Sequence, residues 1–231
     1  MHVPPSLQTD DLSTAINLVG AYYAARFDDF PKRGDSPPFF RGAFFDNCST
    51  DPEDADFFTP ADLLSLPMLS IGLGQYRTVP EVLYYRHPQY SELLKGIGPD
   101  RDLADEPGPL PAHWPARRLE KALCEIRGVS KVTATKLIAR KRPRLFPIFD
   151  RVVKSRLAPD TPDTVFLDTV HAALSTNETL RTRINEVRNG AELPNSISAL
   201  RILDVVSWME GQHPEWRTYT APTADRNFMT Q

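Results

Sequence analysis

The spacing of the apolar residues constrains the fold of this chain more than any other feature. In residues 115–126 the apolar positions Leu119, Ala122, Leu123 and Ile126 follow the i, i+3, i+4, i+7 pattern of a helix with one buried face. No segment shows the alternation of apolar and polar residues that is typical of a strand. The pattern therefore predicts an all-α fold, with further helices over residues 12–27, 163–175, 178–188 and 195–211.

Proline and glycine indicate how these helices are connected. The 231 residues include 22 prolines, well above the ~5% average, but only 11 glycines. This balance favours short helices joined by stiff corners. Thr59, followed by Pro60 and Asp62, predicts a capped helix start, and Pro67 is expected to kink or end that helix.

The stretch 99–113 is a proline-rich linker and the best candidate for a boundary within the chain. It separates an N-terminal helical part with an aromatic-rich loop, residues 1–98, from a second helical part, residues 114–231. We expect the two parts to form one integrated domain.

Several classes of protein are not expected from the composition. Cys48 and Cys124 stand far apart and no Cys/His cluster exists, so we expect neither a metal site nor another cofactor. The start MHVPPSLQTDDL lacks the features of a signal peptide, and no apolar run approaches the ~20 residues that span a bilayer. These observations predict a cytoplasmic protein that does not associate with membranes.

The charges are unevenly distributed. Residues 117–156 contain 13 Lys and Arg against three acids, a local charge of +10 in a chain whose net charge is −3. A basic patch on an acidic body attracts a polyanion to one face. The alternative is a helical face whose charges are paired with acids from the rest of the chain.

A glycine turn lies at the centre of this basic segment. Gly128 separates two predicted helices, and the free N–H groups at the start of the second helix are suited to bind a phosphate. Such contacts hold the backbone of duplex DNA without reading its sequence. The residues expected to make them are Arg127, Gly128, Ser130, Lys131, Val132, Thr133, Lys136 and Arg140.

The segment resembles a known family. "IRGVSKVTATKLIA" resembles the helix-hairpin-helix motif, and "FPIFDRVVKSRL" resembles the segment that follows this motif in base-excision DNA glycosylases. The resemblance covers residues 115–157 and implies a glycosylase-like helical fold with Asp150 as the catalytic carboxylate. The pattern ARKRPRL-P--D also resembles an uncharacterised bacterial family, which implies nothing about chemistry.

Departures from the glycosylase pattern restrict the mechanism that the resemblance implies. Val132 stands where bifunctional members carry a Schiff-base lysine, and Ser130 replaces the usual second glycine of the hairpin. Only the monofunctional reaction, in which water attacks the sugar, is then expected. The flipped base would stack on aromatic side chains. Candidates are Phe39, Phe40, Phe44, Phe45 and Trp114, and the alternative role for all five is packing in the core.

Asp150 also has a purely structural interpretation. It follows Pro147 and precedes a helix, so it is a natural N-cap, and it lies four residues before Lys154, the spacing of a helical ion pair. Three functions therefore remain open: a monofunctional DNA glycosylase, a non-catalytic helix-hairpin-helix DNA-binding module, and a helical scaffold that docks an acidic protein.

Overall fold

The computed structural model describes residues 1–24, 40–48, 51–72 and 77–218. Within these ranges the chain forms eleven α-helices, short 3-10 turns and one π-helical turn, and it contains no strand, which confirms the all-α prediction. The α-helices are α1 (Ser13–Tyr23), α2 (Ala43–Asn47), α3 (Pro60–Ser65), α4 (Thr78–Pro80), α5 (His87–Ile97), α6 (Pro115–Cys124), α7 (Lys131–Lys141), α8 (Arg151–Leu157), α9 (Phe166–Thr176), α10 (Glu178–Gly190) and α11 (Ala199–Gln212).

The start of α3 follows directly from local sequence. The Thr59 hydroxyl accepts a hydrogen bond from the Asp62 N–H, and the Asp62 carboxylate accepts one from the Thr59 N–H at 2.8 Å. Pro60 occupies the first turn, where its missing N–H has no consequence. The helix ends at Ser65, and a 3-10 turn that contains Pro67 follows, as predicted.

Other helix boundaries are also set by capping residues and prolines. Asp150 begins α8, where its Oδ1 accepts a hydrogen bond from the Val152 N–H at 2.9 Å. Asn177 and Ser198 cap α10 and α11 in the same way. The helical segment from Thr78 to Ile97 is divided into α4, the π-helical turn Glu81–Tyr85 and α5, whose first turn contains Pro88.

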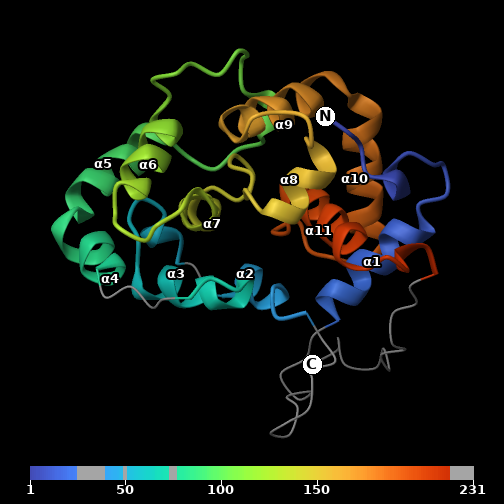
Figure 1. Ribbon diagram of the computed structural model, residues 1–231, viewed down its shortest axis with the longest axis horizontal. Coiled ribbons are helices and arrows are strands. Elements are labelled where there is room, and N and C mark those ends of the chain that lie inside the picture. Colours follow the sequence, from blue (N-terminus) through green and yellow to red (C-terminus); the bar gives the residue numbers. More distant parts are fainter. Residues whose placement is uncertain (25–39, 49–50, 73–76, 219–231) are drawn as a thin grey trace, which may run out of the picture.

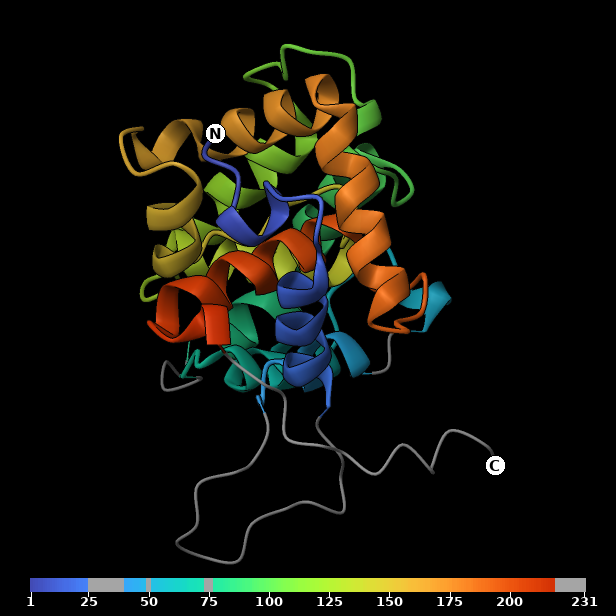
Figure 2. The same ribbon diagram turned by 90° about the vertical axis from the view of Figure 1, so that its right-hand side faces the viewer.

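The helices are arranged around α11 and α7 (Figure 1). Helix α11 packs against α1, α8 and α10, and α6 packs against both α5 and α7. Figure 2 shows α1, α10 and α11 side by side on one face. One hydrophobic cluster runs from Leu7 to Trp216 and includes Leu103 and Leu110 of the expected linker. Residues 99–113 thus contribute to the core that both parts of the chain share.

Much of the positive charge of the basic segment points inward. Arg142 is only 1% exposed. Its guanidinium donates to the carbonyls of Gly98, Ala55 and Leu94 at 2.6–2.9 Å and to Asp56 Oδ1 at 2.6 Å. These bonds join the end of α7 to the N-terminal part of the chain.

The two residues before Arg142 are also buried. Lys141 Nζ lies 2.6 Å from Asp62 Oδ2, and the Arg140 guanidinium donates to the carbonyls of Phe45 and Cys48 at 2.6 and 2.8 Å. Acids and carbonyls from the N-terminal part therefore compensate these charges, which is the pairing that the alternative interpretation of the basic segment required.

Candidate functional site

Asp150 lines a cavity of about 340 Å³. One carboxylate oxygen, Oδ1, is held by the Val152 N–H at the start of α8. The side chain is 24% exposed, so it is accessible but partly desolvated. The cap and the cavity are compatible, because a carboxylate that caps through one oxygen leaves its second oxygen available to a ligand.

Helix α7 brings a lysine to the same cavity. Lys136 Nζ lies 3.7 Å from Asp150 Oδ2 and donates to the Leu69 carbonyl at 3.0 Å. Burial lowers the pKa of Lys136, and the Asp150 carboxylate opposes this shift. Thr135 fixes the approach of the two segments, because its hydroxyl accepts a hydrogen bond from the Phe149 N–H. Lys136 therefore holds Asp150 in place and compensates its charge.

A buried arginine on α11, Arg201, lines the same cavity and binds residues from α1 and α2. Arg201 Nε donates to both carboxylate oxygens of Asp46 at 2.8–2.9 Å, and Nη2 donates to the Tyr22 hydroxyl at 2.7 Å. Gly42 is required beside this hydroxyl, since a Cβ at position 42 would lie 1.8 Å from Tyr22 Oη. Burial raises the pKa of Tyr22 to about 12, so the phenol is a neutral donor and acceptor.

A second carboxylate lies in the cavity, also on α11. Asp204 Oδ2 is paired with Arg201 Nη1, but Oδ1 is buried and has no hydrogen-bond partner among the described residues. Burial raises the pKa of Asp204 to about 6, an effect that Arg201 opposes and Asp150 reinforces. The cavity thus holds two carboxyl groups, one of which takes up a proton near neutral pH. Such pairs are common where acid and base roles are divided.

Aromatic rings form the apolar wall. Phe40 stacks on Tyr22 with ring centroids 5.6 Å apart and an interplanar angle of 8°. Trp208 meets both rings edge-on at 5.9–6.1 Å. All three rings line the cavity, and such surfaces bind a planar aromatic ligand by stacking.

The turn at Gly128 is at the surface. Gly128 has φ +93°, a conformation that favours glycine, and Arg127, Gly128 and Ser130 are exposed. Lys131 is half-buried, 3.3 Å from Glu120, and Nζ donates to the Asp163 carbonyl.

Val132 and Thr133, which are also predicted to contact DNA, are less accessible. Val132 is half-buried and Thr133 is buried, with the Ser130 hydroxyl 3.5 Å from that of Thr133. The turn is therefore open to a ligand mainly through Arg127, Gly128 and Ser130.

Two of the predicted DNA contacts are placed differently from the expectation. Lys136 and Arg140 are predicted to contact DNA, but they are 3% and 8% exposed and are bonded within the protein. The reason is that α7 is buried around most of its circumference, including its polar positions. Lys136 reaches the cavity beside Asp150, whereas Arg140 stacks on Phe45 and holds α2.

The predicted aromatic pocket is also only partly assembled. Phe40 lines the cavity, Phe45 is buried against Arg140 and Arg201, and Trp114 packs in the core beside Phe146. Phe44 is half-buried and does not line this cavity. Phe39 lies outside the described residues. Core packing therefore accounts for Phe45 and Trp114, as the alternative proposed.

The residues missing from the sequence analysis lie on α1 and α11. Arg201, Asp204 and Trp208 stand in the otherwise apolar run "LRILDVVSW", and Tyr22 comes from α1. Charged residues three positions apart in a buried helix were a signal that could have identified Arg201 and Asp204. Nothing in the sequence places Tyr22 beside them.

The described residues contain no group of three His, Cys, Asp or Glu side chains placed to hold a metal ion. Over the same ranges, no helix combines the length and apolar character needed to cross a bilayer.

Comparison with known proteins identifies a family whose function is unknown. No curated protein and no solved structure matches the chain. The model of one family, described as a family of unknown function (DUF6308), matches residues 15–211. This range includes α7, α8, most of α1 and α11, and every charged residue of the cavity. The chain belongs to this family of unknown function, DUF6308.

Proposed function

We propose that the protein is a monofunctional DNA N-glycosylase that binds duplex DNA at the Gly128 turn and hydrolyses the glycosidic bond of a flipped base beside Asp150. The observation that carries the proposal is the cavity itself. It combines a partly exposed Asp150 with a wall of stacked aromatic rings, and it lies at the helix that begins at the exposed turn.

The chemistry requires a group that stabilises positive charge on the sugar. As the bond between the anomeric carbon and the base nitrogen breaks, its electron pair leaves with the base and the sugar becomes oxocarbenium-like. Asp150 stabilises this cation and accepts a proton from the water that attacks the anomeric carbon. Lys136 and the Val152 N–H fix the carboxylate in position.

The departing base needs a proton, and Asp204 is suited to supply it. With its pKa raised to about 6 by burial, Asp204 is partly protonated at neutral pH. The residue lines the cavity, and its Oδ1 has no hydrogen-bond partner among the described residues. The rings of Phe40, Tyr22 and Trp208 provide the surface on which a base would stack. The two carboxyl groups thus have different roles because their environments differ.

The test uses duplex oligonucleotides, each with a single deaminated, oxidised or alkylated base. The wild-type protein should release the base from at least one of them, and Asp150→Asn should reduce the rate by about 10²–10⁴-fold while DNA binding is retained. Asp160→Asn is the matched control, since this exposed carboxylate lies beyond the end of α8 and outside the cavity. Full activity of Asp150→Asn would refute the mechanism.

Two further results separate the proposal from its alternatives. Tight, salt-dependent DNA binding without release of any base would leave a DNA-binding module, and absence of DNA binding would leave a protein scaffold. Borohydride should trap no covalent adduct with the DNA. An adduct at Lys136, the amine that lies 3.7 Å from Asp150, would replace hydrolysis by an imine mechanism.

A further inference from the structure

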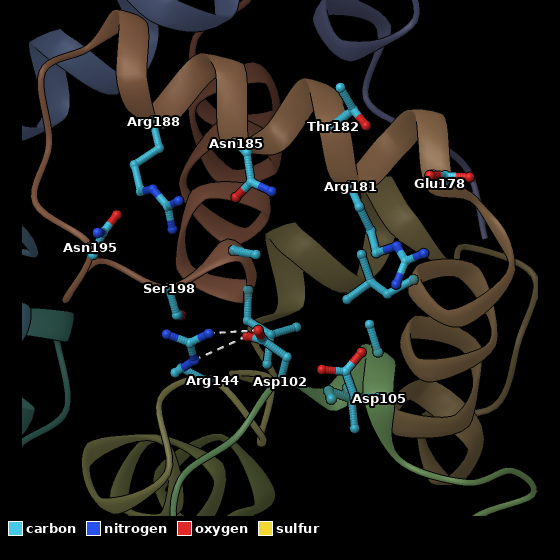
Figure 3. A pocket seen from close by; sticks show the side chains of 15 residues that line it. Asp102, Asp105, Arg144, Glu178, Arg181, Thr182, Asn185, Arg188, Asn195 and Ser198 are labelled. Carbon is cyan, nitrogen blue, oxygen red and sulfur yellow. Dashed lines mark hydrogen bonds and ion pairs between the residues drawn. The ribbon is translucent and has the colours of Figure 1, made fainter.

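A second cavity, of about 540 Å³, shares no residue with the cavity around Asp150. Its walls come from α9, α10, the start of α11, the 3-10 turn Leu103–Asp105 and Arg144 (Figure 3). Its lining is rich in polar and charged side chains, which gives it a different character from the partly aromatic Asp150 cavity.

Two arginines in this cavity have no side-chain partner within the part of the chain that the structure describes. Arg181 and Arg188 lie two turns apart on α10, which places them on one face about 10 Å apart along the axis. Among the described residues, neither guanidinium takes part in a hydrogen bond or an ion pair, and Arg188 Nε is buried without an acceptor. By contrast, Arg183 on the same helix donates to Asp10 at 2.6 Å.

Unpaired guanidinium groups in a concave surface indicate an anionic ligand. A buried N–H without an acceptor destabilises the protein unless a ligand supplies one. Arg144 also lines the cavity, but its charge is already compensated by Asp102 through two hydrogen bonds of 2.6 and 3.1 Å (Figure 3). It is therefore not needed to bind this ligand.

The surroundings of Arg188 favour an oxyanion. In Figure 3 its side chain extends from α10 toward Ser198, and Asn185 projects from the same helix into the cavity. Ser198 is the N-cap of α11, a helix of 14 residues, and Ala199 and Leu200 of its first turn line the cavity. Backbone N–H groups at a helix start and a planar guanidinium both bind phosphate oxygens well.

The other end of the cavity offers acceptors. Glu178 and Asp105 line it, and among the described residues neither carboxylate is in an ion pair. The volume is far larger than a bare phosphate needs and falls in the range of small-molecule sites, about 300–1,000 Å³. A ligand with a phosphate at one end and hydroxyl groups at the other would match both ends.

We propose that this cavity binds a phosphate monoester of a polyhydroxylated small molecule, a sugar phosphate. Arg188 and Asn185 hold the phosphate end, whereas Arg181 and the carboxylates of Glu178 and Asp105 form hydrogen bonds with the hydroxyl groups at the other end. The site is separate from the proposed glycosylase centre, so its occupancy is independent of Asp150.

The test is isothermal titration of the full chain with ribose 5-phosphate, inorganic phosphate and ribose. Ribose 5-phosphate should bind more tightly than either fragment. Loss of one charge-assisted guanidinium contact should weaken binding about 10- to 100-fold in Arg188→Met and in Arg181→Met. Arg118→Met is the control, because Arg118 is an exposed arginine of α6 outside this cavity, and it should bind as the wild type does.

Three results would overturn the proposal: no binding of ribose 5-phosphate, equal weakening by Arg118→Met, or equal affinity for inorganic phosphate and ribose 5-phosphate. Glu178→Gln should weaken ribose 5-phosphate and leave inorganic phosphate unchanged. Asp150→Asn should bind ribose 5-phosphate with wild-type affinity, so failure of the glycosylase proposal and failure of this one are distinguishable.

Discussion

Arg142→Met and Arg127→Met should separate the structural role of the basic segment from its proposed role in DNA binding. Arg142 is buried and bonded to four carbonyls and to Asp56, whereas Arg127 is exposed at the Gly128 turn. Both substitutions remove one positive charge from the same segment. We expect the first to reduce stability and the second to reduce DNA binding.

The size of the first effect follows from the contacts of Arg142. Each hydrogen bond from a charged donor contributes ~1.5–3 kcal/mol, but such values are not additive, and Asp56 is half exposed and regains water when the arginine is lost. Truncating one member of a buried charged network costs about 3–5 kcal/mol. For a chain of 231 residues, this corresponds to a fall in Tm of roughly 10 °C.

Urea denaturation measures the first effect, and the salt dependence of DNA binding measures the second. Arg142→Met should lower the free energy of unfolding by about 3–5 kcal/mol and leave the slope of log K against log salt unchanged. Arg127→Met should change stability by less than about 0.5 kcal/mol and reduce the magnitude of the slope by about 1. If Arg142→Met were as stable as the wild type, or if it alone changed the slope, the division of roles would be wrong.

Two further predictions concern Asp204 and Thr59. Burial raises the pKa of Asp204 from 3.8 to about 6, so its contribution to stability is complete below about pH 4 and is lost as the pH rises through about 6. The difference in the free energy of unfolding between Asp204→Asn and the wild type should therefore shift in favour of the variant by up to roughly 3 kcal/mol as the pH rises from 4 to 8. Urea denaturation at each pH measures this difference. Thr59→Ala removes the capping box of α3 and should lower the free energy of unfolding by about 1 kcal/mol, measured by urea denaturation at neutral pH.

Each of these predictions has a matched control. Asp160→Asn removes an exposed carboxylate, and its stability difference from the wild type should stay nearly constant over the same pH range. A constant difference for Asp204→Asn would contradict the raised pKa. Thr169→Ala removes a half-buried side chain within α9, whose hydroxyl donates only to the Val165 carbonyl of the preceding turn, and should have a smaller effect than Thr59→Ala. Equal effects would show that the capping box contributes nothing specific.

Local sequence alone determined the helical class and many of the helix boundaries. The cap at Thr59, the cap at Asp150 and the turn at Gly128 all form as predicted, because each depends on residues within a few positions of one another. The same locality explains the correct placement of α6 and α7 on either side of the turn.

Only the tertiary structure decided which charges are exposed and which residues surround Asp150. The spacing of Lys136 and Arg140 predicts a shared helix face but not whether another element covers it, and the structure buries both. Tyr22 and Arg201 meet across 179 residues of sequence. A contact of this kind depends on the packing of α1 against α11, which no local pattern encodes, so the cavity could be described only once the helices were assembled.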